Sequence, residues 1–226
     1  MIKCWKEGKK LKFSRDQLLI YAVTDRAWTG KMSLYEQVEA ALKGGATMVQ
    51  LREKGLEGKK SEEFLKEACE IRRLTKAYGV PLIIDDDVDI ALACDADGVH
   101  VGQKDMDAGL ARKLLGPDRI LGVTAKTVEQ ALKAQEQGAD YLGSGAVFGT
   151  STKADAKPMT MEMLRSICTA VSIPVVAIGG ICLDNINGLA GSGAAGAAIV
   201  SGIFAAEDIE GTTRKLRKRM EDNLSM

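Results

Sequence analysis

Short apolar runs of strand length alternate along the chain with longer segments whose apolar residues recur at helical spacing. The run at residues 18–23 is followed by a segment with Leu34, Val38 and Leu42 on one helical face, which ends at Gly44. The same change of period repeats to the end of the chain. Expected strands lie at residues 18–23, 47–51, 81–84, 98–101, 120–123, 141–142, 175–178 and 197–200. Expected helices lie at residues 34–42, 64–77, 88–94, 108–115, 127–137, 161–171 and 183–189, with a last one through Leu216 and Met220.

Eight strand-helix units predict a single (β/α)8 barrel, an α/β fold of the TIM type. Parallel strands need crossover connections of about this length, and eight such units close into a barrel whose site lies at the carboxyl ends of the strands. A doubly wound open sheet is the alternative, although it usually has fewer units. No linker interrupts the run, so we expect a barrel domain over residues 18–226 after a short polar extension at residues 1–17.

The composition favours one domain that acts on small molecules. With 226 residues, 46% of them hydrophobic, the chain can bury one sizeable core. Lys plus Arg equals Asp plus Glu at 31 each and aromatic residues make up 4%, so neither a basic field nor a base-stacking surface is available for nucleic acid. No apolar run has membrane-spanning length, and residues 1–12 lack the apolar core of a leader. Five scattered cysteines without a C-x-x-C pair indicate reduced thiols, so we expect a soluble cytoplasmic protein.

Polar side chains end the second expected strand. Residues on a strand alternate between its faces, so Gln50, Arg52 and Lys54 fall on one side and can reach one cavity together. Basic residues at the carboxyl end of a strand indicate an anion-binding site. One amide and two cations suit a polar ring together with a phosphate.

Acidic residues follow the next two expected strands. Asp85, Asp86 and Asp87 end the third strand, and Asp105 follows the fourth. Carboxylates at the ends of adjacent strands can share Mg²⁺, which prefers one or two carboxylates and fills its other positions with phosphate oxygens and water. The alternative for Asp87 alone is a helix N-cap, since an acid before a helix bonds its first N–H groups.

A loop rich in hydroxyl groups follows the sixth expected strand. Thr150, Thr152 and Lys153 together indicate an anion-binding loop, whereas Ser151 is equally well explained as a solvated loop residue.

Glycine and serine follow the last two expected strands. Gly179 and Gly180 come after the seventh, and Val200 and Ser201 end the eighth. Loops at these two positions of a barrel commonly hold a phosphate with backbone N–H groups, and glycine permits the close approach. A glycine pair is also typical of a tight turn. If this group and the group of Arg52, Lys54 and Lys153 both bind anions, the protein has two separate anion sites. A single phosphate needs only one of them.

The only histidine of the sequence, His100, lies between Val99 and Val101 in an expected strand. We interpret it as a packed core residue rather than a catalytic one. Histidine general-base chemistry and a Ser-His or Cys-His nucleophile are therefore poorly supported.

Six motifs together resemble the thiamine-phosphate synthase family, in the same order and spacing from about residue 18 onward. They are Gln50-Leu51-Arg52-Glu53-Lys54, Asp85-Asp86-Asp87, Gly102-Gln103-Lys104-Asp105, Gly122-Val123-Thr124-Ala125, Thr150-Ser151-Thr152-Lys153 and Gly179-Gly180-Ile181. The resemblance implies a (β/α)8 barrel that joins hydroxymethylpyrimidine diphosphate to hydroxyethylthiazole phosphate and releases diphosphate. It also suggests a homodimer.

The resemblance also assigns roles by position. Gln50, Asp85 and Thr124 would contact the pyrimidine, while Arg52, Lys54 and Lys153 would hold the diphosphate. Asp86 and Asp105 would bind Mg²⁺. The thiazole phosphate would be held by Thr150, Thr152, Gly180, Val200 and Ser201. Of these residues, Arg52, Lys54, Lys153 and Thr124 would carry the catalysis.

Three positions depart from the usual family pattern. Asp85 replaces Asn, Thr124 replaces the frequent Ser, and Lys126 replaces the frequent His. Threonine keeps the hydroxyl group, but Asp85 removes an amide donor. Asp85 would then either accept from the exocyclic amine of the pyrimidine or act as a further carboxylate near the metal.

Two other functions are compatible with the same barrel. A related thiazole tautomerase would not release diphosphate, and its members lack the complete set of metal and diphosphate ligands. A non-catalytic protein that binds thiamine phosphate or a phosphosugar is the alternative from another class.

Overall fold

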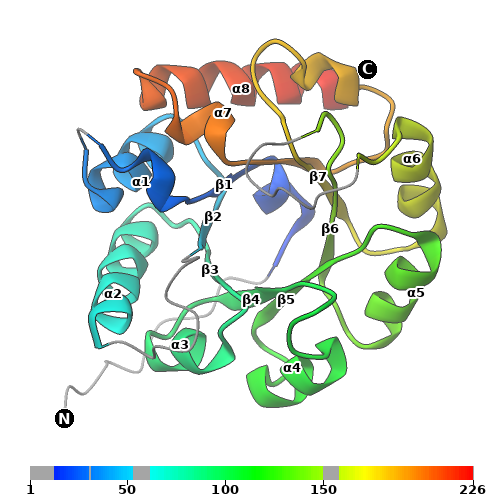
Figure 1. Cartoon of the computed structure of the whole chain (residues 1–226), viewed down its shortest axis with the longest axis horizontal. Helices are drawn as coiled ribbons and strands as arrows, with labels where there is room; N and C mark the ends of the chain where they lie inside the picture. Colours follow the sequence, from blue (N-terminus) through cyan, green and yellow to red (C-terminus); the bar gives the residue numbers. More distant parts are fainter. Residues whose placement is uncertain (1–12, 31, 53–61, 150–157, 226) are drawn as a thin grey trace.

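The protein folds into a closed barrel of eight parallel strands surrounded by helices (Figure 1). The computed structural model describes residues 13–30, 32–52, 62–149 and 158–225. The strands follow one another around the barrel in sequence order, and the first pairs with the last, Tyr21 opposite Ala198. This closure confirms the predicted (β/α)8 barrel and rules out the open sheet.

The strands are short and parallel throughout. They are β1 (Ile20–Val23), β2 (Met48–Leu51), β3 (Leu82–Asp85), β4 (Gly98–Val101), β5 (Ile120–Thr124), β6 (Tyr141–Gly145), β7 (Val175–Ile178) and β8 (Gly196–Ile199). The helices of the outer ring are α1 (Leu34–Lys43), α2 (Glu62–Ala77), α3 (Val88–Ala93), α4 (Ala108–Leu115), α5 (Val128–Glu136), α6 (Met161–Ala170), α7 (Ser201–Phe204) and α8 (Ile209–Leu224). Three 3₁₀ turns complete the set, η1 (Arg15–Leu18), η2 (Arg26–Trp28) and η3 (Ile186–Leu189).

Three predicted elements differ from the observed ones. The start of the first expected strand is the 3₁₀ turn η1, and the helix expected at 183–189 is only the 3₁₀ turn η3. Before η3, the side chain of Asn185 accepts from the backbone of Cys182 and donates to Gly180, so these residues form a hydrogen-bonded loop instead of a first helical turn. The sixth strand extends to Gly145, which pairs with Ile178 of β7, and glycine is required there because a side chain would collide with the carbonyl group of Ile178.

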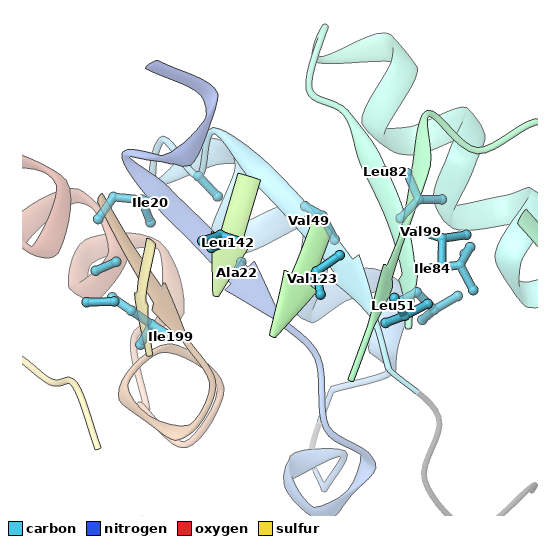
Figure 2. Packing of buried hydrophobic residues seen from close by; sticks show 14 of the residues in the cluster. Ile20, Ala22, Val49, Leu51, Leu82, Ile84, Val99, Val123, Leu142 and Ile199 are labelled. Atoms are coloured by element: carbon cyan, nitrogen blue, oxygen red, sulfur yellow. The ribbon is translucent and has the colours of Figure 1, made fainter. Parts of the chain in front are cut away.

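Side chains of the strands alternate between two cores. The outward side chains pack under the helices, and on β1 and β2 they are Ile20, Ala22, Val49 and Leu51. The close view in Figure 2 shows them together with those of neighbouring strands. The residues between them point into the barrel, where Tyr21, Val23, Met48, Ile83, Tyr141 and Val176 form a separate cluster. The same alternation therefore places Gln50 of β2, Asp85 of β3, His100 of β4 and Thr124 of β5 inside the barrel.

None of the helices in the described ranges combines the length and the apolar character required to cross a bilayer. The four cysteines in these ranges, Cys69, Cys94, Cys168 and Cys182, are free thiols, as the sequence predicts. Burial raises the pKa of Cys94 to about 12 and that of Cys168 to about 11, so both remain protonated at neutral pH.

Candidate active site

One cavity opens at the carboxyl ends of the strands, where barrels of this type carry their active sites. Nine of the thirteen residues predicted from the sequence line it: Gln50, Arg52, Asp85, Asp86, Asp105, Thr124, Gly180, Val200 and Ser201. The other four, Lys54, Thr150, Thr152 and Lys153, lie outside the described residues. These nine residues come from six of the eight strands or the loops that follow them.

Arg52 lies directly after β2 and is held between two carboxylates. Its Nη1 atom lies 2.9 Å from Oδ2 of Asp25, and its Nε atom lies 3.6 Å from Oδ2 of Asp85. Its backbone N–H also donates to the hydroxyl group of Thr24. The residue is only 8% exposed. A guanidinium group fixed in this way is preorganised to bind an anion at the cavity.

Asp25 is a site residue that sequence reasoning missed. Its second carboxylate oxygen accepts the backbone N–H of Ala27, so the side chain caps η2 while it orients Arg52. The available signal was its position: an acid at the end of β1, next to a strand that ends in arginine.

The three consecutive acids after β3 have different environments. Asp87 caps α3 by accepting the backbone N–H of Ile90, which confirms the alternative considered for this residue. Asp85 and Asp86 line the cavity instead. Asp86 has φ 60°, and its backbone N–H donates to the carbonyl oxygen of His100. This left-handed backbone, rare outside glycine, turns the chain between the strand and the capped helix.

Asp86 and Asp105 fit the oxygen donor set of Mg²⁺. They follow the adjacent strands β3 and β4 and line the same cavity. One oxygen of Asp105 accepts the backbone N–H of Gly102 at 3.0 Å, which fixes the orientation of the carboxylate. Within the described ranges no cluster of three or more acidic, histidine or cysteine ligands occurs. A two-carboxylate set suits Mg²⁺, because this ion keeps several waters and takes phosphate oxygens from a substrate.

His100 faces the cavity, so its interpretation as a packed core residue is wrong in this respect. Its neighbours Val99 and Val101 point outward into the apolar layer, and the alternation along β4 turns the imidazole inward. Nε2 lies 3.0 Å from the hydroxyl group of Thr124, and Nδ1 lies 3.1 Å from the hydroxyl group of Tyr141. The imidazole thus connects Thr124, which lines the cavity, to Tyr141, which lies beneath it.

Two tyrosines inside the barrel were also missed from the sequence. The amide nitrogen of Gln50 donates to the hydroxyl group of Tyr21 at 2.7 Å, and that group lies 2.8 Å from the hydroxyl group of Tyr141. Burial raises the pKa of both tyrosines above the ordinary value, so both keep their protons at neutral pH. Their inward positions on β1 and β6 were the only signal available.

The last two strands present backbone rather than charged side chains. After β7, Gly179 and Gly180 adopt φ 102° and φ 68°. A Cβ atom at Gly180 would collide with the carbonyl oxygens of Gly149 and Phe148, so only glycine fits. Val200 and Ser201 begin α7 beside this turn, at the positions where barrels commonly bind phosphate.

Lys126, one of the three departures from the family pattern, also lines the cavity. Its backbone N–H donates to the side chain of Gln130, which holds the loop between β5 and α5. A cationic side chain therefore stands at this edge of the cavity.

A (β/α)8 barrel with this combination of carboxylates, a buried arginine and a glycine turn is typical of enzymes that act on small anionic molecules. Comparison with known proteins specifies the family. The model of the thiamine monophosphate synthase family matches residues 20–203, and the chain belongs to this family.

The relatives cover most of the chain. Thiamine-phosphate synthase 2 of Streptococcus pneumoniae serotype 4 is 47% identical over 212 residues, which are 94% of this chain and all of the relative. Thiamine-phosphate synthase of Clostridioides difficile is 50% identical over 198 residues, which are 88% of this chain and 93% of the relative. Among solved structures, thiamine phosphate pyrophosphorylase from Pyrococcus furiosus is 41% identical with a TM-score of 0.85, and the match covers 93% of this chain and 98% of that one.

Proposed function

We propose that this enzyme condenses 4-amino-2-methyl-5-hydroxymethylpyrimidine diphosphate with 4-methyl-5-(2-phosphoethyl)thiazole to give thiamine phosphate and diphosphate. The observation that carries the proposal is that one cavity is lined by two separate groups of residues suited to bind anions. Arg52 and the carboxylates Asp86 and Asp105 stand on one side, and Gly180 and Ser201 stand on the other. A single phosphorylated substrate needs only one of these sites.

The pyrimidine is bound in the barrel by Gln50, Asp85 and Thr124. The amide nitrogen of Gln50 is held by Tyr21, which leaves the amide oxygen to accept a hydrogen bond from the exocyclic amine of the ring. The carboxylate of Asp85 pairs with Arg52 in the structure. This ion pair is a third role for Asp85, besides accepting from the exocyclic amine and acting as a further carboxylate near the metal.

The diphosphate is held by Arg52, Lys54 and Lys153. The bond between the pyrimidine methylene carbon and the diphosphate oxygen breaks first, and the electron-rich aminopyrimidine carries the resulting cation until the thiazole nitrogen attacks. Cations that face the departing diphosphate stabilise the negative charge that builds up on it. When held by Asp86 and Asp105, Mg²⁺ would supply Lewis-acid stabilisation of the same charge.

The phosphate of the thiazole is bound by Gly180, Val200 and Ser201 together with Thr150 and Thr152. Backbone N–H groups can approach a phosphate closely at Gly180, because no Cβ atom intervenes. This arrangement fixes the thiazole with its ring nitrogen toward the pyrimidine methylene carbon, and positioning of two reactants is a large part of such catalysis.

Neither alternative function makes use of the whole cavity. A thiazole tautomerase does not release diphosphate and has no need of Arg52 held beside two carboxylates. A phosphosugar-binding protein has no need of a pyrimidine site with Gln50 and Thr124.

The proposal is tested by incubating the purified protein with both substrates, with and without Mg²⁺, and following thiamine phosphate and diphosphate together. We expect equal formation of both products, dependent on Mg²⁺ and abolished in Asp86→Asn/Asp105→Asn. Absence of product in a protein shown to be folded, with Mg²⁺ present, contradicts the proposal. Isomerised thiazole without diphosphate release would instead identify the tautomerase.

We propose further that the enzyme acts in the cytoplasm as a homodimer, without nucleic-acid or membrane partners. The four free thiols in the described ranges support a reducing compartment, and the family resemblance supports the dimer. Sedimentation equilibrium at several protein concentrations tests the dimer, and a monomer at all of them would contradict it.

A further inference from the structure

Five side chains from five strands form a continuous chain of hydrogen bonds across the inside of the barrel. The order is Gln50 on β2, Tyr21 on β1, Tyr141 on β6, His100 on β4 and Thr124 on β5. The four donor-acceptor distances lie between 2.7 and 3.1 Å. Gln50, His100 and Thr124 line the cavity, whereas Tyr141 is fully buried beneath it.

The chain of hydrogen bonds can run in two directions, because each hydroxyl group has one proton to donate and can also accept. In the direction that satisfies every donor within the chain, the amide nitrogen of Gln50 donates to Tyr21, and the hydroxyl group of Tyr21 gives its own proton to the oxygen of Tyr141. The hydroxyl group of Tyr141 then donates to Nδ1 of His100. The imidazole consequently has its proton on Nε2 and donates it to the oxygen of Thr124. The hydroxyl proton of Thr124 is thereby left to point elsewhere.

We propose that Tyr141 is a positioning residue that holds His100 as the neutral Nε2–H tautomer and thereby makes the hydroxyl group of Thr124 a hydrogen-bond donor toward the pyrimidine substrate. Tyr141 does this without contact to substrate, since it acts through the imidazole. The donor role of Thr124 toward the pyrimidine rests on the proposed function, whereas the assignment of the Nε2–H tautomer to His100 does not.

The surroundings of Tyr141 are shaped to hold this chain in place. A Cβ atom at Gly122 would collide with the phenol ring of Tyr141 and with Nδ1 of His100, and one at Gly143 would press on the imidazole. Two neighbouring strands therefore have glycine where the hydrogen-bonded pair needs room. Below, Phe13 packs against Tyr141 with ring centroids 5.9 Å apart, which keeps the phenol from moving downward.

Burial keeps the chain intact at neutral pH. The apolar surroundings raise the pKa of both tyrosines, so neither hydroxyl group loses the proton that it donates. In the opposite direction Tyr141 would donate to Tyr21, whose oxygen would accept from Gln50 as well, and the buried hydroxyl proton of Tyr21 would have no acceptor within the chain. His100 would then have its proton on Nδ1, and Thr124 would donate to Nε2 instead of to a substrate. The two directions thus predict opposite tautomers.

The test is the ¹⁵N spectrum of the imidazole, which is uniquely assigned because the sequence contains one histidine. In the full-length protein at about pH 8.5, where an ordinary imidazole is neutral, we expect Nε2 to be protonated and Nδ1 to be unprotonated. Tyr141→Phe should convert this single tautomer to a mixture. Tyr21→Phe should also give a mixture, because it removes the hydroxyl group that fixes the direction at Tyr141, whereas exposed Tyr35→Phe serves as the matched control and should leave the tautomer unchanged.

A kinetic measurement separates positioning from a general loss of structure. Loss of one donated hydrogen bond at the pyrimidine predicts that Tyr141→Phe raises KM for the pyrimidine diphosphate roughly five- to tenfold. KM for the thiazole phosphate should stay within about twofold, whereas partial unfolding would lower the apparent kcat and leave both KM values unchanged.

Three results would overturn the proposal: an Nδ1–H tautomer in the parent protein, a doubly protonated imidazole, or an unchanged tautomer in folded Tyr141→Phe. The spectrum of the parent protein decides the direction even if Tyr141→Phe does not fold. If the expected tautomer is found but no thiamine phosphate is formed, the proposed function fails and the assignment of Tyr141 stands.

Discussion

The two ends of the barrel use the same residue types in opposite ways. At the amino ends of the strands, Arg72 forms two hydrogen bonds with Asp97, whose carboxylate also accepts the backbone N–H of Leu82. At the carboxyl ends, Arg52 lies between Asp25 and Asp85 beside an open cavity. Both arginines are largely buried, but only Arg52 faces a space that a ligand can enter.

The difference shows how position in a barrel divides stability from function. The Arg72 pair joins the strand backbone to a helix, so its hydrogen bonds are made within the fold. The Arg52 pair joins side chains that all line or flank the cavity, so it can exchange partners when an anion binds. Matched substitutions at the two ends should therefore affect different quantities.

Removing the arginine at each end should give the largest contrast. Arg52→Ala is expected to lower kcat/KM roughly 10²–10³-fold, the scale for loss of one preorganised charge-stabilising donor. Arg72→Ala should instead leave Asp97 buried without its partner and cost about 3 kcal/mol of unfolding free energy. Steady-state kinetics and urea unfolding of both variants provide the measurement. Equal losses of activity in the two folded variants would contradict the division.

Lys153 extends the comparison to a residue outside the described ranges. We predict that Lys153→Ala lowers turnover roughly 10²–10³-fold, because Lys153 is assigned to the departing diphosphate. Arg214→Ala is a suitable control, since this substitution removes the same charge from an exposed position on α8, away from the residues that line the cavity. Turnover of Lys153→Ala within about threefold of the parent would remove Lys153 from the assigned role.

Two glycines with the same backbone conformation test the phosphate turn. Gly180 after β7 has φ 68°, and Gly191, before β8 at the other end, has φ 67° with no atom near its missing Cβ. Gly180→Ala should raise KM for the thiazole phosphate roughly 10–100-fold, because the added Cβ atom would collide with Gly149 and Phe148 and displace the backbone N–H groups that are assigned to the phosphate. Gly191→Ala should cost about 1 kcal/mol of stability and leave both KM values unchanged. A similar change of KM in both variants would show that backbone strain alone is responsible.

The smallest effect is expected for the acids. Asp85→Asn removes a negative charge beside Arg52 and restores the amide usual in the family, so KM for the pyrimidine diphosphate should fall roughly two- to fivefold. Asp97→Asn should leave KM unchanged and cost about 2 kcal/mol of unfolding free energy through its weakened bonds to Arg72. A rise of KM in Asp85→Asn would show that the carboxylate itself binds the pyrimidine.

The fold was largely predictable because its signal is local. Alternation of strand and helix period is visible residue by residue, and β7 and α4 coincide with their predicted bounds. The errors lie where tertiary contacts override the local pattern. The sixth expected strand ends at residue 142, yet β6 continues to Gly145, because Gly143 and Gly145 pair with Val176 and Ile178 of β7.

Residues that line the cavity could be predicted where a charged side chain follows the end of a strand, as for Arg52 and Asp105. Tyr21, Tyr141 and the inward face of His100 were not, because apolar neighbours make such residues look like ordinary core. Their roles depend on contacts across the barrel, between residues far apart in sequence. The register between the strands of the closed sheet determines these contacts. The sequence of one strand does not reveal that register.

The most direct test of two anion sites in one cavity is a crystal structure of the protein with thiamine phosphate, diphosphate and Mg²⁺. We predict the phosphate of thiamine phosphate at Gly180 and Ser201, the pyrimidine ring between Gln50 and Thr124, and diphosphate at Arg52. Thiamine phosphate bound with its phosphate at Arg52, or both anions bound on the same side of the cavity, would contradict the account.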